Sequence, residues 1–406
     1  MSTSNLVILG GGEDQLPAYV EGRRLGYRII GVDQRPDALG ARYADEFLCV
    51  TTREPDAIAA ELGDKVVAAV LSPASDVAQS SVAALNERYR GVGQPSPAAV
   101  RASQDKSFFH SVVAELGFPV YAFAQSDSAD ELMEAAGRIS FPMVVKPTDA
   151  SGSKGLSCVE NAEALPEAIE QARKHSFTGE VIIEEFIEGQ HFSVERFSQD
   201  GVAALTVVTE RGLTAMPHMI SMSHLVPAAL DPAVEQRLAS MVDAILAHID
   251  HHSGPVNLDF ILTSDGRIYF IEMGARLGGN GMPMLVQQAL GVNTVQAAIK
   301  LAVGESPELD GHERQQFVML RILASQHDGL LTAVTGLEET RELDGITDVR
   351  LFKQPGDHVR QYTQAAHKLG YLLASADSRH ELLERVDRAL QTLKFEIDPH
   401  PSETNE

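Results

Sequence analysis

The chain has 406 residues, 44% of them hydrophobic, which is enough for two or three domains with buried cores. It carries 33 basic and 57 acidic residues, a net charge of −24, which argues against a surface for nucleic acids or anionic membranes. Its two cysteines, Cys49 and Cys158, are far apart in the sequence, so neither a disulfide framework nor a zinc site is expected.

The start of the chain has no basic segment followed by a long apolar run, and nowhere do 18 apolar residues follow one another. We therefore expect neither a secretory leader nor a membrane span, and we predict a cytoplasmic location.

The first segments predict an α/β domain over residues 1–95. Strands are expected at residues 5–9, 27–32 and 66–71, with helices at 15–25 and 77–89. Three consecutive glycines, residues 10–12, follow the first strand. Their spacing differs from the GxGxxG pattern that lets a pyrophosphate approach, so a dinucleotide site with Asp33 on a ribose is not favoured.

A proline-rich stretch at residues 94–97 predicts a boundary, after which helices and strands are mixed. A helix is expected at residues 126–140 and strands at 141–145, 181–183 and 192–197. From about Ala298 the chain changes character, with a charged connector at 305–315, strands at 317–323, 349–352 and 368–375, and a helix at 378–393. The polar tail, residues 398–406, is expected to be disordered.

Residues 257–282 read as a β-hairpin that runs into a glycine-rich loop. If the turn is centred between Ser264 and Asp265, Asp259 pairs with Phe270, and Glu272 lies on the same face as Asp259. Converging carboxylates with no basic residue between them repel each other unless a cation is bound, and oxygen ligands suit Mg²⁺. The alternative is an exposed hairpin whose acidic residues are only solvated.

Arg276 follows Glu272 by four residues, and its guanidinium is suited to bind a phosphate or a carboxylate through two hydrogen bonds.

Two lysines upstream are also suited to bind phosphate. Lys106 lies in a helical stretch, where it could also be a solvated charge. Lys146 ends an apolar run and precedes Pro147, so its ammonium is desolvated unless an anion meets it.

A small, flexible loop follows Lys146, and its backbone amides can wrap phosphate oxygens. Taken alone, such a loop could equally be an ordinary surface turn. Its residues are Ser151, Gly152, Ser153, Lys154 and Gly155.

The segment 181–197 leads from an apolar strand into Glu184 and Glu185. Such a strand edge can offer backbone groups to an adenine, with Phe186 and Ile187 covering its faces. The alternative is an amphipathic strand with solvated glutamates, and His191 by itself would more often be structural.

The joint order of Lys106, VVKP, SGSKG, VIIEEFIEG with His191, and the hairpin ending in FIEMGAR resembles the ATP-grasp superfamily of ligases. The resemblance covers about residues 95–300. It implies an α/β protein with the ATP-grasp fold. A Rossmann-like N-terminal α/β domain would occupy residues 1–95 and an ATP-grasp domain 96–300, with a lid at about 140–190. A C-terminal α+β domain would occupy 301–397.

The resemblance also implies roles in binding ATP and Mg²⁺, for which Mn²⁺ could substitute. Lys106 and Lys146 would contact the phosphates, with the loop 151–155 closing over them. The adenine would be held by Glu184 and, through backbone groups, by Glu185 and Ile187, while His191 would reach the ribose. Asp259 and Glu272 would bind the metal. Arg276 would stabilise an acyl phosphate. The catalytic candidates are Arg276 and Lys146.

One position departs from the family pattern. The family usually reads Glu-x-Asn-x-Arg, with the asparagine as a further metal ligand, whereas this chain has Gly274 there. Asn280, Asn257 or a water molecule could substitute, and the alternative is a catalytically inactive descendant.

The segment 212–227 carries His218 and His224 among three methionines, and it resembles the substrate-facing segment of ligases that join amino acids. A histidine there could orient a carboxylate or accept a proton from an amine, or be only structural. Glu195 could bind the amine, and Gly278 and Gly279 are the remaining candidates for the substrate site.

The resemblance implies that a small, amino-acid-like carboxylate attacks the γ-phosphate of ATP and that an amine then displaces phosphate from the acyl phosphate. The alternatives are a purine-pathway type of enzyme, which the triple-glycine turn resembles, a ligase to a carrier thiol, and a silent nucleotide-binding regulator. A biotin-dependent carboxylase is less favoured because there is no Met-Lys dipeptide. The family leads us to expect small-molecule substrates and a homodimer. Neither a nucleic acid nor a membrane is expected as a partner.

Overall fold

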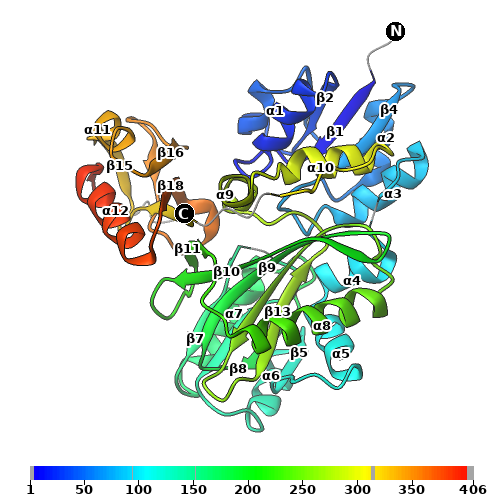
Figure 1. The fold of residues 1–406 in the computed structure, drawn as a ribbon. Helices are drawn as coiled ribbons and strands as arrows, with labels where there is room; N and C mark the ends of the chain where they lie inside the picture. Colours follow the sequence, from blue (N-terminus) through cyan, green and yellow to red (C-terminus); the bar gives the residue numbers. More distant parts are fainter. Residues whose placement is uncertain (1–3, 94, 151, 312–315, 400–406) are drawn as a thin grey trace. The chain divides into compact units, whose positions relative to one another are not determined.

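A computed structural model describes residues 4–93, 95–150, 152–311 and 316–399 (Figure 1). The chain forms two compact units, each made of three segments. The first unit contains Met1–Tyr121, Ile187–Val208 and Leu230–His312, and the second contains Ala122–Phe186, Thr209–Ala229 and Glu313–Glu406. The domain boundaries after residues 95, 300 and 397 stay predictions. None of the helices among the described residues is long and apolar enough to cross a membrane.

The N-terminal part of the first unit is a four-stranded parallel sheet, as its βαβ opening predicts. Its strand order is β3-β2-β1-β4, and β1 is buried along its whole length because helices cover a parallel sheet. The strands are β1 (Asn5–Leu9), β2 (Arg28–Val32), β3 (Glu46–Leu48) and β4 (Val67–Leu71), and the helices are α1 (Leu16–Arg24), α2 (Pro55–Leu62) and α3 (Gln79–Tyr89), with a 3-10 turn at Leu39–Arg42.

The triple-glycine turn after β1 is bonded within the protein. Gly11 N–H donates to Asp33 Oδ2 at 2.9 Å, and Gly12 N–H donates to Gln15 Oε1 at 3.0 Å. Burial alone would raise the pKa of Asp33, but hydrogen bonds from Arg35 and Gly11 hold it below its ordinary value. The amides of Gly11 and Gly12 are therefore engaged by side chains, and that of Gly10 by the Val32 carbonyl.

A second group of strands in the first unit carries the predicted hairpin. β12 (Gly254–Leu262) pairs antiparallel with β13 (Ile268–Gly274) on one side and with β9 (Gln190–Gln199) on the other. Phe192 and Phe260 stack with ring centroids 5.1 Å apart, and both are buried. The helices of this part are α4 (Pro97–Gln104), α5 (Lys106–Glu115), α8 (Pro232–His248), α9 (Met282–Leu290) and α10 (Thr294–Ala302).

The register of this hairpin corrects the sequence-based pairing of Asp259 with Phe270. Phe260 lies opposite Phe270, and the register then shifts, so that Asp259 lies directly opposite Glu272. The cause is twofold. The connecting loop is closed by Thr263 N–H donating to the Arg267 carbonyl at 3.0 Å, and β13 carries one extra residue beyond Phe270. The two carboxylates are therefore direct neighbours.

The second unit contains a four-stranded antiparallel sheet of order β5-β8-β6-β7. The helix expected at 126–140 is shorter, because Ser128 caps it by accepting from Glu131 N–H and it ends before Gly137. The strand expected at 141–145 instead spans Met143–Pro147 and so includes Lys146. The elements are β5 (Phe123–Ser126), α6 (Ala129–Ala136), β6 (Met143–Pro147), β7 (Ser157–Val159), α7 (Leu165–His175) and β8 (Val181–Glu185).

The strand β10 (Val202–Leu213) begins in the first unit and ends in the second. In the second unit β11, β14, β18 and β16 follow in that order, with α12 packed on them, and β17, β15 and β19 form a small separate sheet. The elements are β11 (Ser221–Val226), β14 (Phe317–Ala324), β15 (Gly329–Thr335), α11 (Leu337–Arg341), β16 (Ile346–Leu351), β17 (His358–Val359), a 3-10 turn at Ala365–His367, β18 (Lys368–Ala376), α12 (Arg379–Thr392) and β19 (Lys394–Asp398).

Asp398, the first residue of the predicted disordered tail, is the last residue of β19. Residues 400–406 lie outside the described residues.

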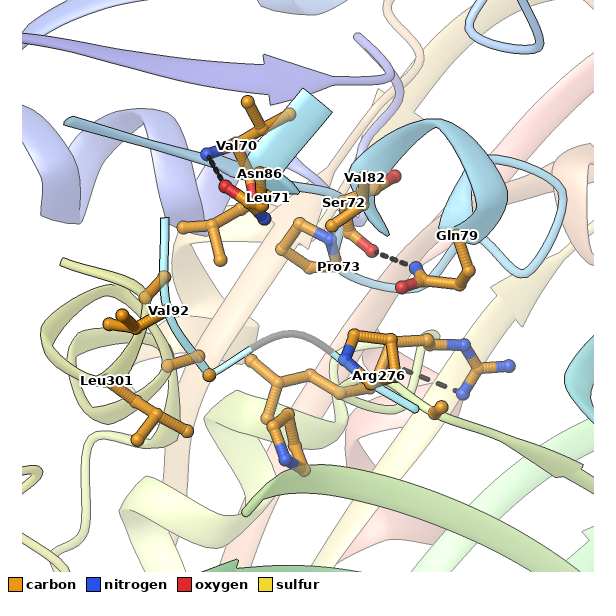
Figure 2. Close-up of a pocket in the computed structure, with 17 residues that line it drawn as sticks. Val70, Leu71, Ser72, Pro73, Gln79, Val82, Asn86, Val92, Arg276 and Leu301 are labelled. Atoms are coloured by element: carbon orange, nitrogen blue, oxygen red, sulfur yellow. Dashed lines mark hydrogen bonds between the residues drawn. The ribbon is translucent and has the colours of Figure 1, made fainter. Parts of the chain in front are cut away.

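β4 is an edge strand of the parallel sheet, and a side chain takes the place of its missing neighbour. Asn86, on α3, accepts from Val70 N–H and donates to the Val70 carbonyl, both at 2.9 Å (Figure 2). Val70 and Asn86 are both buried. The amide thus satisfies two main-chain groups that water cannot reach.

We expect Asn86→Ala to lower the free energy of unfolding by about 2–4 kcal/mol, because two buried main-chain groups lose their partners. Urea denaturation followed by circular dichroism measures this. Glu87→Ala, at an exposed position of the same helix, is the control. A loss as small as the control's would mean that Asn86 does not hold the edge strand.

Candidate active site

The opposed carboxylates of the hairpin form the centre of the first unit's polar cluster. Asp259 is buried, and its Oδ1 accepts from Ser193 Oγ at 2.5 Å from the neighbouring strand β9. Glu272 Oε2 lies 3.4 Å from Nζ of Lys106, the first residue of α5, which packs against β13. The structure therefore brings Lys106, Asp259 and Glu272 together.

This donor set fits a magnesium ion that also binds phosphates. Like charges directly opposite each other across a strand pair destabilise it, and the ion pair of Lys106 with Glu272 offsets part of that repulsion. Mg²⁺ usually takes one or two carboxylates and fills its other positions with water and substrate phosphates. Within the described ranges no group of three or more His, Cys, Asp or Glu could hold a metal by itself.

Arg276 lies just beyond β13 and is held by one acceptor on β12 of the same hairpin and one in the loop after β4. Its Nη2 donates to Asp76 Oδ2 at 2.8 Å, and its Nη1 donates to Asn257 Oδ1 at 3.3 Å. Burial alone would lower the pKa of this guanidinium, but Asp76, Glu195 and Glu272 together raise it above its ordinary value. Arg276 thus stays a cation in a buried setting.

Glu195, on β9, joins the hairpin to the glycine-rich loop. Asn257 Nδ2 donates to its Oε1 at 2.7 Å, and Gly278 N–H donates to its Oε2 at 3.2 Å. Burial raises the pKa of Glu195 to about 7 despite these donors and nearby Arg276. A Cβ at Gly278 would lie 2.1 Å from Glu195 Oε1, so only glycine allows this approach. Substrate roles for Glu195, Gly278 and Gly279 stay predictions.

Three further predicted positions also lie in the first unit. His191 is half-buried on β9 opposite Ile261, and Ile187 is half-buried just before that strand. Asn257, proposed from sequence as a substitute metal ligand, has both ends of its amide engaged, by Glu195 and by Arg276. Asn280 lies in the loop before α9 with a φ of 55°.

In the second unit Lys146 forms a buried ion pair with Glu184. Lys146 Nζ lies 2.7 Å from Glu184 Oε2, and the side chains are 7% and 4% exposed. They stand on the paired strands β6 and β8, where Lys146 is opposite Ile182. The anion that the desolvated Lys146 requires is therefore the carboxylate of Glu184. The family resemblance assigns Glu184 to the adenine.

Glu185 follows at the end of β8, where main-chain pairing changes. Its N–H donates to the Ala122 carbonyl at 2.8 Å, while Ala122 N–H donates to the side-chain Oε2 of Glu185 at 3.2 Å. Because the Glu185 N–H already donates to Ala122, only the Glu185 carbonyl is left for the predicted backbone contact with an adenine.

The predicted phosphate loop has a backbone rich in left-handed residues. Gly152, Ser153 and Gly155 have φ angles of 70°, 58° and 69°. The Gly152 carbonyl accepts from Ala365 N–H at 3.0 Å, and Lys154 is exposed. Ser151 lies outside the described residues. Successive amides in such a conformation can form an anion-binding concavity.

The two candidate histidines differ in their surroundings. His224 is buried on β11, with Thr209 Oγ1 at 3.0 Å from Nδ1 and Ser221 Oγ at 2.9 Å from Nε2. Burial, with a smaller effect of Arg211, lowers its pKa to about 3, so the ring is neutral at physiological pH. His218 is half-buried in the loop between β10 and β11.

A cavity of about 50 Å³ lies behind the main chain of Arg276, whose guanidinium points away from it (Figure 2). Its lining includes Val70, Val82, Val92 and Leu301. A space of this size and character suits a water molecule or two rather than a nucleotide. The polar cluster on the other side of Arg276 is the candidate site.

Sequence reasoning missed two members of this cluster. Asp76 and Ser193 enter the site by tertiary contacts, from the loop after β4 and from β9. A signal for Asp76 does exist, because it follows the carboxyl end of a parallel strand, where ligand-binding residues gather in α/β domains.

The family model for the carbamoyl-phosphate synthase L chain, ATP binding domain, matches residues 105–309, just over half of the chain. The chain belongs to this ATP-grasp family. Residues 321–398 match a second model, the L-amino acid ligase C-terminal domain 2. The predicted superfamily, fold class and enzyme class are thereby confirmed: the chain is an ATP-grasp carboxylate–amine ligase, which activates a carboxylate with ATP and couples it to an amine.

The chain is also similar to individual proteins and to solved structures. The uncharacterized protein y4rH of Sinorhizobium fredii is 29% identical over 75% of this chain, which aligns with 63% of that protein. A formate-dependent phosphoribosylglycinamide formyltransferase of Synechococcus sp. is 24% identical, with 97% of this chain and 98% of that protein covered. The crystal structure of L-amino acid ligase from Bacillus licheniformis has the same fold, with a TM-score of 0.81 at 20% identity, covering 98% of this chain and 99% of that one.

Glu195 gives this ATP-grasp ligase a testable pH dependence. Its pKa rises from 4.5 to about 7 on folding, so between these values the folded protein holds a proton that the unfolded chain releases. Its contribution to stability is therefore complete below pH 4.5 and lost as pH rises through 7.

We expect wild type to lose about 2–3 kcal/mol of unfolding free energy relative to Glu195→Gln between pH 5 and pH 8. Guanidinium denaturation of both proteins across this range measures the difference. If the unfolding free energies of wild type and Glu195→Gln changed in parallel with pH, the raised pKa of a buried Glu195 would be contradicted.

Proposed function

We propose that this ATP-grasp ligase joins two small amino-acid-like substrates, one as the activated carboxylate and the other as the amine. The match of residues 321–398 to an L-amino acid ligase domain and the fold shared with the Bacillus licheniformis ligase support this substrate class. The substrate class rests on the domain match. The single observation that carries the ATP-dependent chemistry is the hairpin, in which opposed Asp259 and Glu272 lie beside Lys106.

In this proposal Asp259 and Glu272 hold Mg²⁺, and Mn²⁺ can take its place. The ion, when bound, offsets the negative charge of the ATP phosphates. Lys106, 3.4 Å from Glu272, adds a cation for a phosphate, and Ser193 keeps the Asp259 carboxylate in place.

The remaining nucleotide-binding roles in this proposal are those that the family resemblance implies. Lys146 leaves or shares its contact with Glu184 to reach a phosphate, while the loop 151–155 covers the phosphates with its amides and Lys154. The adenine is held by Glu184, by the carbonyl of Glu185 and by Ile187, and His191 reaches the ribose. Water exclusion by the closed loop protects the acyl phosphate from hydrolysis.

The chemistry consists of two displacements. A carboxylate oxygen attacks the γ-phosphorus and ADP leaves; the amine nitrogen then attacks the acyl carbon, loses a proton, and phosphate leaves. The first step brings two anions together, and the second develops negative charge on the acyl oxygen and on the leaving phosphate, so preorganised cations contribute most of the catalysis. Arg276, already fixed and charged, stabilises the acyl phosphate and the charge that develops during its formation.

A purine-pathway type of reaction is the second candidate, and one observation favours it. The formate-dependent phosphoribosylglycinamide formyltransferase of Synechococcus sp. aligns with 97% of this chain. Transfer to a carrier thiol and a silent regulatory role, the latter suggested by Gly274, are weaker candidates, because no contact among the described residues of the site favours either. A homodimer also stays a prediction.

We expect the wild-type protein to release ADP when incubated with MgATP and pooled amino acids, with a new dipeptide-like mass in the products. Coupled ADP detection and mass spectrometry measure these. Formate with phosphoribosylglycinamide serves as the competing substrate pair. ADP release with that pair and none with amino acids would replace the proposal by its purine alternative.

Glu272→Gln should lower the rate of ADP formation at least 100-fold, since it removes one of two proposed metal ligands. The matched control is Glu134→Gln, at an exposed ion pair with Arg138, which should keep the wild-type rate. Retention of activity by Glu272→Gln would mean that the metal binds elsewhere.

A further inference from the structure

Gly274 occupies the position where the family pattern has asparagine, and the space beside it is filled. A Cβ built on Gly274 would lie 2.4 Å from Asp76 Oδ1, 2.6 Å from Arg276 Cζ and 2.8 Å from Arg276 Nη2. Contacts below 3.0 Å are essentially never seen for a real Cβ. Any side chain at position 274 must therefore displace the Asp76–Arg276 ion pair.

Asp76 is itself firmly placed. Its carbonyl accepts from Gln79 N–H at 3.1 Å and from Gln104 Nε2 at 2.8 Å. The same loop is attached to the segment after β13, because Ala74 N–H donates to the Leu277 carbonyl at 3.1 Å. The carboxylate is thus presented to Arg276 from a fixed main chain, and both side chains of the pair are 14% exposed.

We infer that Asp76 is a positioning residue for Arg276 and that Gly274 is required because it leaves room for the Asp76 carboxylate. This inference rests on the proposed role of Arg276 at the acyl phosphate. Asp76 holds Nη2 and Asn257 holds Nη1, which fixes the plane of the guanidinium. The Nε–H of Arg276 has no hydrogen-bond acceptor among the described residues, so the guanidinium retains a donor while its two other corners are anchored.

Asp76 could instead be a metal ligand that replaces the missing asparagine. Its contacts argue against this, because its Oδ2 lies 2.8 Å from a guanidinium, and a second cation placed on the same carboxylate would be repelled by Arg276. An Arg–carboxylate pair of this kind orients the arginine and offsets the cost of burying its charge. Positioning and metal ligation make different predictions for metal binding.

The first experiment compares Asp76→Ala and Asp76→Asn with wild type in ADP formation and in binding of Mn²⁺ in the presence of ADP. We expect kcat to fall at least 10-fold for Asp76→Ala, with partial recovery in Asp76→Asn, which can still accept from Nη2. The Kd of Mn²⁺ should stay within twofold. A Kd at least 10-fold weaker would make Asp76 a metal ligand and overturn the inference, as would an unchanged kcat. Asp265→Ala, which removes an exposed ion pair at the turn of the same hairpin, is the control and should match wild type.

The second experiment tests the shared space without an activity assay. Gly274→Ala should lower the melting temperature by several degrees on its own. In the Asp76→Ala background, where the carboxylate is gone, the same substitution should cost less than half as much. Equal costs in both backgrounds would overturn the coupling. If wild type releases no ADP with any substrate pair, the proposed function fails, whereas this thermal cycle still decides whether Asp76 and Gly274 compete for one space.

Discussion

The structure of the candidate site depends on one electrostatic constraint: two carboxylates are held directly opposite each other on one antiparallel strand pair. Asp259 is buried, whereas the Glu272 side chain is 42% exposed. Asp259 and Glu272 reach this arrangement through the register shift in the hairpin. Such a pair is unfavourable unless cations or hydrogen-bond donors offset the repulsion. The surrounding residues respond to it, with Ser193 donating to one carboxylate and Lys106 paired with the other.

Two ion pairs outside the opposed carboxylates show how a chain with a net charge of −24 can present cations to an anionic nucleotide. Each unit holds a cation in contact with a carboxylate: the largely buried Arg276 with Asp76 in the first, and the buried Lys146 with Glu184 in the second. A buried ion pair contributes little net stability, but the loss of one partner leaves an uncompensated charge. These ion pairs therefore serve mainly to keep the two cations charged and oriented, and they contribute little to the stability of the fold.

Much of the site could be predicted from sequence because its parts are local. The hairpin follows from turn residues between apolar runs, and the order of lysines, glycine loop and carboxylates is read along one chain. What could not be predicted depends on tertiary packing. The extra residue in β13 changes which side chain faces Asp259, and no local propensity signals it.

Two other features depend on contacts between distant segments. Asp76 is separated from Arg276 by 200 positions and enters the site only because the loop after β4 packs on the segment after β13. The raised pKa of Glu195 follows from its burial in the folded chain, which outweighs the hydrogen bonds from Gly278 and Asn257, and not from its neighbours in sequence. The departure at Gly274, which from sequence alone suggests a lost metal ligand, acquires a steric reason once Asp76 is located.

The central claim, that the opposed hairpin carboxylates bind a divalent cation together with a nucleotide, is tested most directly by electron paramagnetic resonance of Mn²⁺ with saturating ADP. We expect wild type to bind Mn²⁺ in an ADP-dependent manner and Asp259→Asn to bind it at least 10-fold more weakly. Equal Mn²⁺ affinity in wild type and Asp259→Asn, under the same ADP concentration, would contradict the account.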